Sequence, residues 1–341
     1  MIHQAIERMI SREDLLPEEA TAVMNQIAEG NATGAQIGSF LTALRMKGAT
    51  AGEIASFARV MQECAVPVTP QVSGMMVDTC GTGGDRSGSG GTFNISTAAG
   101  IVAAAAGVLI VKHGNRSVSS RCGSADVLET LGVTIEQTPE AAAKTVEETG
   151  IGFFYAPRYH PAMRHVAPVR KELGIYTVFN ILGPLLNPAR AQARLIGVYD
   201  PGLVMIVADA LRELGVQRAM VVHGEGLDEI TVTGSTFIAE LNQGTLNFST
   251  ITPEEFGIAR SRNETIRGGN PEENAAIIRS VLSGTPGPCQ DIVALNAGAA
   301  IYLGGKATNL HDGVNKAYHV IRLGKATEKL DELIRVSGRA A

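Results

Sequence analysis

The segment Met75-Met-Val-Asp-Thr-Cys-Gly-Thr-Gly-Gly-Asp85 joins a short apolar run to a glycine-rich turn. Its first part, Met75–Cys80, has the length of a buried strand, and the glycines that follow mark the end of that strand. Farther along, an alanine-rich run is expected to form a helix as far as Ala106, and Val108–Val111 is the next run of strand length. A strand, a helix and a second strand in this order predict two parallel strands joined by a helical crossover.

The same alternation continues towards the C-terminus. The rhythm predicts a largely parallel sheet with helices on both faces, and such sheets bind ligands at the carboxyl ends of their strands. The further strands are expected at Ile151–Ala156, Arg194–Tyr199 and Arg218–His223. The further helices are expected at Ala125–Leu131, at Pro139–Thr149 with Thr138 as its cap, at Gly202–Leu214, and from Pro271 onwards.

The first 66 residues show helical periodicity instead. The connector Val66-Pro-Val-Thr-Pro70 is stiff and non-helical, because the residue before a proline avoids the helical conformation. The predicted fold class is α/β, with a small N-terminal helical domain at 1–66 and a larger α/β domain at 71–341 that has a mainly parallel central sheet. The four N-terminal helices are expected at Ile2–Met9, Pro17–Glu29, Gly34–Lys47 and Ala51–Ala65.

Composition excludes several classes of protein. The 341-residue chain has a formal net charge of −5, which argues against a protein that coats nucleic acid. Its four cysteines lie far apart without metal-ligand spacing, so we expect reduced thiols in a reducing compartment. The longest apolar stretch, Ala98–Val111, has 14 residues, fewer than the roughly 20 that span a bilayer. With charges near its start instead of a signal peptide, the chain is expected in the cytoplasm, with no nucleic-acid or membrane partner.

The glycine-rich turn and the helix after it have the features of an anion site. Glycines let the backbone approach a ligand and turn N–H groups towards phosphate oxygens. Ser96 or Thr97 is expected to cap the helix, whose N-terminus adds oriented donors and about half a positive charge. A strand, a glycine turn and a helix are also a common structural connection, so the turn alone leaves phosphate binding and a purely structural role both open.

The distribution of charge favours phosphate binding. Residues 86–125 contain no Asp or Glu, although the whole chain has 34 acidic residues among 341. Lys112 directly follows a predicted strand and would emerge at the same sheet edge as the glycine turn. His113 beside it has two interpretations, a structural residue or a group that transfers protons. The cations of the interval are Arg86, Lys112, Arg116 and Arg121.

A series of motifs runs along essentially the whole chain: Gly-Thr-Gly-Gly-Asp (81–85), Asn-Ile-Ser-Thr (94–97), Lys-His-Gly-Asn-Arg-Ser-Val-Ser-Ser (112–120), Gly-Ser-Ala-Asp (123–126), Tyr-His-Pro-Ala-Met (159–163), Val-Arg-Lys (169–171), Phe-Asn-Ile-Leu-Gly-Pro-Leu (179–185) and Gly-Leu-Asp-Glu (226–229). Their types and order closely resemble those of the anthranilate phosphoribosyltransferases. The resemblance implies transfer of the phosphoribosyl group of phosphoribosyl pyrophosphate to the amine of anthranilate, in the second step of tryptophan synthesis from chorismate. It also implies a homodimer, and a helical domain joined by residues of about 171–186.

The resemblance further implies the residues that bind the first substrate. Phosphoribosyl pyrophosphate would contact Gly81, Gly84, Asp85, Thr92, Asn94, Ile95, Ser96, Thr97, Lys112, His113, Gly114, Asn115, Arg116, Ser117, Val118, Ser119, Ser120 and Ser124. No residue is assigned as catalytic, although His113 is a candidate.

Anthranilate and the metal have smaller implied sites. Anthranilate would contact Gly81, Asn115 and Arg170, and an arginine suits this role because a guanidinium pairs with a carboxylate through two hydrogen bonds. Magnesium, as one or two ions per subunit, would be held by Ser96, Asp228 and Glu229, whose hard oxygen atoms are the ligands it prefers. Without the Gly-Leu-Asp-Glu motif, two adjacent acidic residues on a turn would be interpreted as solvated surface side chains with no metal.

Two other functions stay open at this point. A pyrimidine nucleoside phosphorylase of the same fold shares the lysine-histidine-glycine loop but lacks Asn115-Arg116-Ser117 and the 180–184 motif. A nucleic-acid-binding paralogue needs a basic face and tends to lose the carboxylates at 228–229. The chain also departs from the family form twice: Arg86–Gly91 lengthens the glycine loop, and Tyr176 stands where arginine is frequent.

Overall fold

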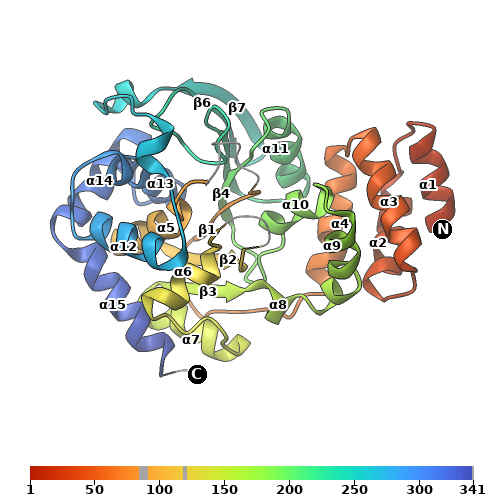
Figure 1. Cartoon of the computed structure of the whole chain (residues 1–341), viewed down its shortest axis with the longest axis horizontal. Helices are drawn as coiled ribbons and strands as arrows, with labels where there is room; N and C mark the ends of the chain where they lie inside the picture. Colours follow the sequence, from red (N-terminus) through yellow and green to blue (C-terminus); the bar gives the residue numbers. More distant parts are fainter. Residues whose placement is uncertain (84–90, 118–120, 340–341) are drawn as a thin grey trace.

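A computed structural model describes residues 1–83, 91–117 and 121–339. The N-terminal helices form a smaller lobe beside the sheet-containing lobe (Figure 1): α1 (Ile2–Ile10), α2 (Pro17–Ala28), α3 (Gly34–Lys47) and α4 (Ala51–Glu63). Thr33 and Thr50 cap α3 and α4, because their hydroxyls accept hydrogen bonds from backbone N–H groups at 3.3 and 3.2 Å. The predicted helical character of this region is confirmed.

The larger lobe is built on a sheet whose strand order in the described ranges is β3-β2-β1-β4-β5-β6-β7. The pairs β3–β2, β2–β1, β1–β4 and β4–β5 are parallel, so the prediction of a mainly parallel sheet is confirmed. The strands are β1 (Met76–Gly81), β2 (Leu109–Gly114), β3 (Ile151–Tyr155), β4 (Ala193–Gly197), β5 (Arg218–His223), β6 (Thr236–Asn242) and β7 (Thr245–Ile251).

The sequence analysis missed the antiparallel hairpin β6–β7. Its two-residue turn, Gln243-Gly244, has positive φ at both positions, 48° and 83°. Such turns are recognised mainly by Asn-Gly or Asp-Gly, and glutamine at the first position hides the signal.

Helices cover both faces of the sheet. Alternate residues of β4 point to opposite sides, so that Leu195 enters the core beneath α5 (Ile95–Ala105) and α13 (Pro288–Leu303), while Ile196 enters the core shared with α11 (Leu203–Glu213) and the N-terminal helices. The remaining helices are α6 (Ser124–Leu131), α7 (Pro139–Thr149, capped by Thr138 as predicted), α8 (Ala156–Tyr159), α9 (Ala167–Leu173), α10 (Val178–Leu182), α12 (Pro271–Leu282), α14 (Leu310–Arg322) and α15 (Lys325–Ser337). No helix in these ranges combines the length and apolar character needed to cross a bilayer.

The chain returns from the sheet to the N-terminal helices between β3 and β4. Helix α9 contacts α3, and α10 contacts both α3 and α4 (Figure 1). Phe179 and Leu182 of α10 share one apolar core with Phe40 and Phe57 of the N-terminal helices. Side chains of the α9–α10 segment are therefore held by one lobe and lie next to the strand ends of the other.

Candidate functional site

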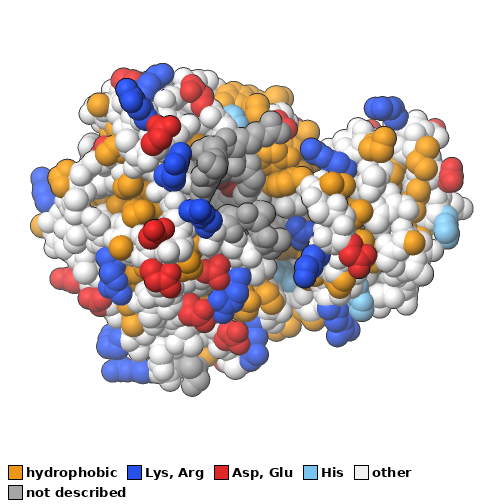
Figure 2. Space-filling view, in the orientation of Figure 1, with side chains coloured by type: hydrophobic (Ala, Val, Ile, Leu, Met, Phe, Trp, Pro, Cys, Tyr) orange, Lys and Arg blue, Asp and Glu red, His pale blue; other side chains and the backbone are white. Residues whose placement is uncertain are grey.

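The carboxyl ends of the central strands bring the predicted site segments to one edge of the sheet. Gly81 at the end of β1 pairs with Gly197 at the end of β4, and the Lys112–Gly114 end of β2 lies on the other side of β1. Figure 2 shows the surface hollowed between the two lobes, with basic side chains beside the hollow. The predicted residues Gly84, Asp85, Val118, Ser119 and Ser120 lie outside the described residues, as do 86–90 of the lengthened loop.

The acidic turn after β5 lies directly against the glycine turn after β1. The Gly83 N–H donates a hydrogen bond to Asp228 Oδ2 at 2.8 Å. A Cβ at Gly81 would lie 2.0 Å from the same oxygen, and a Cβ at Gly197 would lie 1.5 Å from the Asp228 backbone oxygen. Glycine is required at both positions by this close approach, which the sequence analysis did not foresee.

Two side chains that the sequence analysis did not single out hold the acidic turn. His223 Nδ1 lies 2.9 Å from the Val198 carbonyl oxygen, and the Gly226 N–H donates to His223 Nε2 at 3.2 Å. This pattern fits a neutral ring with its proton on Nδ1. Below the turn, the Asn296 amide pairs with both backbone groups of Ile230, at 3.0 and 2.8 Å. The Asp228 and Glu229 side chains are buried here, with 8% and 9% exposure.

The carboxylates of Asp228 and Glu229 fit magnesium better than a metal ion whose ligands must all come from the protein. Among the described residues, no group of three or more His, Cys, Asp or Glu side chains could hold a metal ion. Magnesium is commonly bound through one or two carboxylates, with water and substrate phosphates completing its shell. Asp228 and Glu229, beside the glycine turn, could provide such a partial shell.

Ser96, the third predicted metal ligand, has a cation as its neighbour. The Lys112 ammonium donates to Ser96 Oγ at 3.1 Å and to the Thr79 carbonyl, and the residue is only 4% exposed. A positive charge at this distance opposes a metal ion at the same oxygen. In this arrangement Ser96 lies beside Lys112, and its role as a magnesium ligand stays a prediction.

His113, near the end of β2, forms a buried pair with a second histidine. Its Nε2 lies 3.1 Å from His160 Nε2, so one ring donates and the other accepts. Burial lowers the pKa of His160 to about 4 and the pKa of His113 well below its usual value. Both rings are therefore neutral near pH 7, which favours the structural interpretation of His113.

The loop after β2 is packed against the start of α6. Arg116 makes two hydrogen bonds to the Glu129 carboxylate, at 2.7 and 3.1 Å, and a third to Asp126 at 3.2 Å. These contacts raise the pKa of Arg116 and compensate its charge. The interval without acids ends just before Asp126, and two acids beyond it, Asp126 and Glu129, pair with Arg116. The sequence count of cations therefore overestimated the positive charge of this loop that is not paired with a carboxylate.

Asn115 and its neighbours directly follow the end of β2 and carry polar groups. Asn115 Oδ1 accepts from the Arg116 N–H at 2.8 Å, and no described residue holds its Nδ2 group, which leaves a donor for a ligand. Ser124 contacts the Asn115 carbonyl at 3.4 Å. The Ser117 N–H donates to Asp126 at 2.9 Å.

The start of α5 differs from the sequence prediction. The helix begins at Ile95, and Asn94 occupies the capping position without a side-chain cap, so neither Ser96 nor Thr97 is the cap. The Asn94 amide instead donates to the Cys122 carbonyl at 3.1 Å and accepts from Asn274 at 2.9 Å. Thr97 is 2% exposed, and no described residue pairs with its hydroxyl.

Thr92 lies outside this helix. It forms an isolated bridge with Arg267 on the segment that leads to α12.

Arg170 approaches from the other lobe. Its guanidinium donates to Asn180 Oδ1 at 3.3 Å and lies over the Phe179 ring, 5.7 Å from the centroid. Burial lowers the pKa of Arg170 from its usual value. The other N–H groups of this guanidinium could donate to a planar anion.

A buried group of charges beneath the edge was missed by the sequence analysis. Asp78 is fully buried and accepts from Asn187 at 2.7 Å and from the His113 N–H at 3.2 Å. Its Cα partner in β4 is Arg194, whose guanidinium donates to the Pro184 carbonyl at 2.9 Å. Asp78 and Arg194 each stand in a run that is otherwise mainly apolar, and this is the sequence signal from which buried charges could have been predicted.

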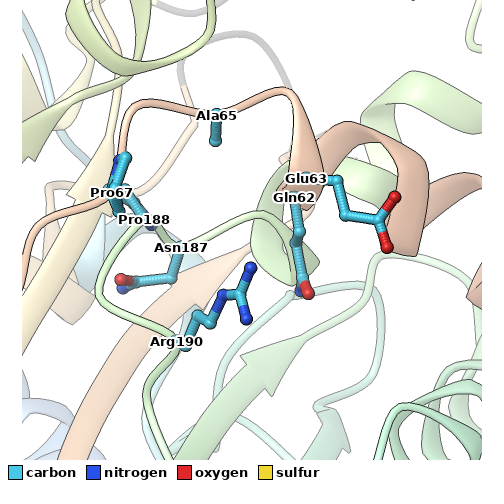
Figure 3. A pocket seen from close by; sticks show the side chains of 7 residues that line it. All are labelled: Gln62, Glu63, Ala65, Pro67, Asn187, Pro188 and Arg190. Atoms are coloured by element: carbon cyan, nitrogen blue, oxygen red, sulfur yellow. The ribbon is translucent and has the colours of Figure 1, made fainter.

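A small cavity of about 130 Å³ lies away from this edge, at the connector that follows α4 (Figure 3). Its lining residues are Gln62, Glu63, Ala65, Pro67, Asn187, Pro188 and Arg190. Ligand pockets usually measure about 300–1,000 Å³, so this cavity is too small for a sugar pyrophosphate.

Comparisons with known proteins cover nearly the whole chain. Residues 3–65 match the helical bundle domain, and residues 73–327 the a/b domain, of the glycosyl transferase family. The anthranilate phosphoribosyltransferase of Methanocorpusculum labreanum is 53% identical over 99% of this chain and 98% of its own length. A crystal structure of anthranilate phosphoribosyltransferase from Thermus thermophilus is 45% identical, with a TM-score of 0.92 and coverage of 98% and 99% of the two chains.

A more distant structure carries ligands. The anthranilate phosphoribosyltransferase of Saccharomyces cerevisiae in complex with PRPP and Mg is 29% identical, with a TM-score of 0.87 over 99% of this chain and 98% of that chain.

Proposed function

This chain belongs to the anthranilate phosphoribosyltransferase family, and we propose that it binds its substrates and magnesium where the glycine turn and the acidic turn meet. The reaction transfers the phosphoribosyl group of phosphoribosyl pyrophosphate to the amine of anthranilate and releases pyrophosphate. The hydrogen bond from Gly83 to Asp228 carries this proposal, because it joins the turn that suits phosphate to the turn that suits magnesium.

The anion groups act on the leaving pyrophosphate. Negative charge grows on pyrophosphate as the bond to the anomeric carbon breaks, so donors fixed before the reaction lower the barrier. The start of α5 supplies N–H groups, and Lys112 beside Ser96 supplies an ammonium. Magnesium, when bound, adds charge stabilisation on the phosphate oxygens, and Asp228 and Glu229 are the residues that would hold it.

The anthranilate groups fix the nucleophile. The Arg170 guanidinium can pair with the carboxylate of anthranilate. The Nδ2 group of Asn115, which no described residue binds, can donate to an acceptor on the same molecule. When both substrates are bound and the amine is oriented towards the anomeric carbon, a bimolecular reaction becomes effectively unimolecular, which lowers its entropic cost. An aromatic amine is mostly unprotonated at neutral pH, so it attacks with its own lone pair. No strong base is required, and His113 acts as a structural residue within its pair with His160.

The experiment follows the loss of anthranilate fluorescence when phosphoribosyl pyrophosphate and magnesium are added. Asp228→Asn and Glu229→Gln should lower turnover and shift the magnesium dependence, whereas Arg170→Lys should mainly raise KM for anthranilate because the bidentate pair is lost. Arg164→Ala, a change at an exposed cation on the same stretch, is the matched control. Unchanged activity and magnesium dependence in both carboxylate variants would refute the metal assignment. Phosphorolysis of a pyrimidine nucleoside, or tight DNA binding, would instead support the other functions.

The molecule is further proposed to be a homodimer that uses the N-terminal helices. Met1, Ile10, Leu16 and Met46 of this lobe are large apolar residues with exposures of 54–72%. Covering such residues favours association in water. Sedimentation of the wild type and of Met46→Glu tests this, since a monomeric wild type would contradict it.

Two smaller proposals concern location and domain division. We propose that the protein is located in the cytoplasm, and the free thiols of its four cysteines support this because the cytoplasm is reducing. The domain division is 1–66 with 171–186 for the helical part and 71–341 for the remainder, supported by the shared core of α10 and the N-terminal helices.

A further inference from the structure

We propose that Tyr176 is a positioning residue that fixes the orientation of the Thr82–Gly83 peptide and so links the anthranilate side of the site to the pyrophosphate side. This inference rests on the proposed function. Tyr176 lies between α9 and α10, and its hydroxyl is 2.5 Å from the Thr82 carbonyl oxygen and 2.8 Å from the Gly83 carbonyl oxygen. A phenol has one proton, which these two acceptors share.

The hydrogen bond from Tyr176 restrains the orientation of the peptide between Thr82 and Gly83. The Thr82 carbonyl and the Gly83 N–H belong to the same planar trans peptide, in which the C=O and N–H bonds point in opposite directions. Tyr176 donates to the carbonyl on one side, and the N–H donates to Asp228 Oδ2 on the other, at 2.8 Å. Rotation of this peptide would break both hydrogen bonds together. Glycine at 83, with a φ of 66°, makes such rotation easy in the absence of a restraint.

The ring of Tyr176 is held in place by a second tyrosine. Its centroid lies 4.4 Å from that of Tyr199, with 60° between the ring planes. Tyr199 is 8% exposed at the end of β4, and no described residue pairs with its hydroxyl. The two phenols are therefore in contact but differ in one respect: only the Tyr176 hydroxyl is bonded to the glycine turn.

A chain of hydrogen bonds connects this contact to Arg170. Asn180 Oδ1 accepts from the Arg170 guanidinium at 3.3 Å and from the Thr177 N–H at 3.0 Å. Thr177 is the next residue after Tyr176. The guanidinium that suits the anthranilate carboxylate and the hydroxyl that contacts the glycine turn are thus linked through the short segment from Tyr176 to Asn180.

The test compares Tyr176→Phe with Tyr199→Phe, since each change removes one hydroxyl and keeps the ring. In Tyr176→Phe we expect KM for phosphoribosyl pyrophosphate to rise about threefold to tenfold, as for the loss of one hydrogen bond, with a smaller change in kcat. Tyr199→Phe should keep both constants within about twofold, because none of the described residues forms a hydrogen bond with its hydroxyl. Melting temperatures of both variants are measured to show that the fold persists.

A second readout does not depend on activity. Amide hydrogen exchange of the ligand-free protein should be faster at Thr82 and Gly83 in Tyr176→Phe than in the wild type, and unchanged in Tyr199→Phe. Equal effects of the two changes, or no effect of Tyr176→Phe on KM and exchange, would overturn the inference. A wild type without turnover would refute the proposed function instead, while faster exchange in Tyr176→Phe would still support the role of the hydroxyl.

Discussion

Replacement of Gly81 by alanine tests how strictly the site depends on the position of the Asp228 carboxylate. The added Cβ would lie 2.0 Å from Asp228 Oδ2, whereas ordinary contact begins near 3.4 Å, so the oxygen must move by about 1.4 Å. Misplacement of a positioned group by about 1 Å can lower a rate by about a hundredfold. We therefore expect kcat/KM for phosphoribosyl pyrophosphate to fall by about a hundredfold, equivalent to about 2.7 kcal/mol.

The same change should leave the protein folded. The displaced atom is the end of a rotatable side chain, and the hydrogen bond lost from Gly83 is worth about 1 kcal/mol. The assay is anthranilate fluorescence at several magnesium concentrations, together with a thermal melt. Gly52→Ala is the control, because its Cβ, at the start of α4, would meet the Glu213 carboxylate at an ordinary 3.7 Å. Full kcat/KM in Gly81→Ala at every magnesium concentration would refute the importance of the Asp228 position.

Two further outcomes are expected. Gly197→Ala should destabilise the fold by about 1–3 kcal/mol or more in urea unfolding, because its Cβ would lie 1.5 Å from a backbone oxygen that cannot rotate away; a wild-type midpoint would contradict this packing. The His113–His160 pair should make stability fall as pH decreases below about 6.5, since burial lowers both pKa values in the folded state and only the unfolded state takes up protons there. The slope is up to about 1.4 kcal/mol per pH unit for each histidine, measured by urea unfolding between pH 7 and about 5, and a flat profile would show that the pair is not buried and neutral.

The parallel part of the sheet could be predicted because its signal is local. Apolar runs such as Val108–Val111 alternate with helical stretches, and each run ends at glycine or a polar turn. The β6–β7 hairpin has an exposed outer strand and a Gln-Gly turn, so neither its hydrophobicity nor its turn residues were distinctive. Boundaries shifted by one or two residues where hydrogen bonding, rather than residue type, ends an element.

The site was predicted at the level of segments more than of contacts. The acidic turn and the glycine turn were each recognised, but sequence spacing does not reveal that Gly81 and Gly197 both face Asp228. The ion pairs of Arg116 with Asp126 and Glu129 were not foreseen, because both acids come after the interval without acids. The contact of Arg116 with phosphoribosyl pyrophosphate stays a prediction. Tyr176 was noted only as a departure from a family pattern, since its partners lie more than 90 residues earlier in the chain.

The return of α9 and α10 to the N-terminal helices has a consequence for how the protein is made. The first 66 residues leave the ribosome about 120 residues before Leu186, the last apolar residue of the returning segment in their shared core. At about 5–20 residues per second, this corresponds to roughly 6–24 s during which the early helices lack the apolar side chains of the returning segment. Nascent chains should therefore expose the apolar face around Phe40 and Phe57 for that time, and chaperones that bind such faces would meet this protein during synthesis rather than after release.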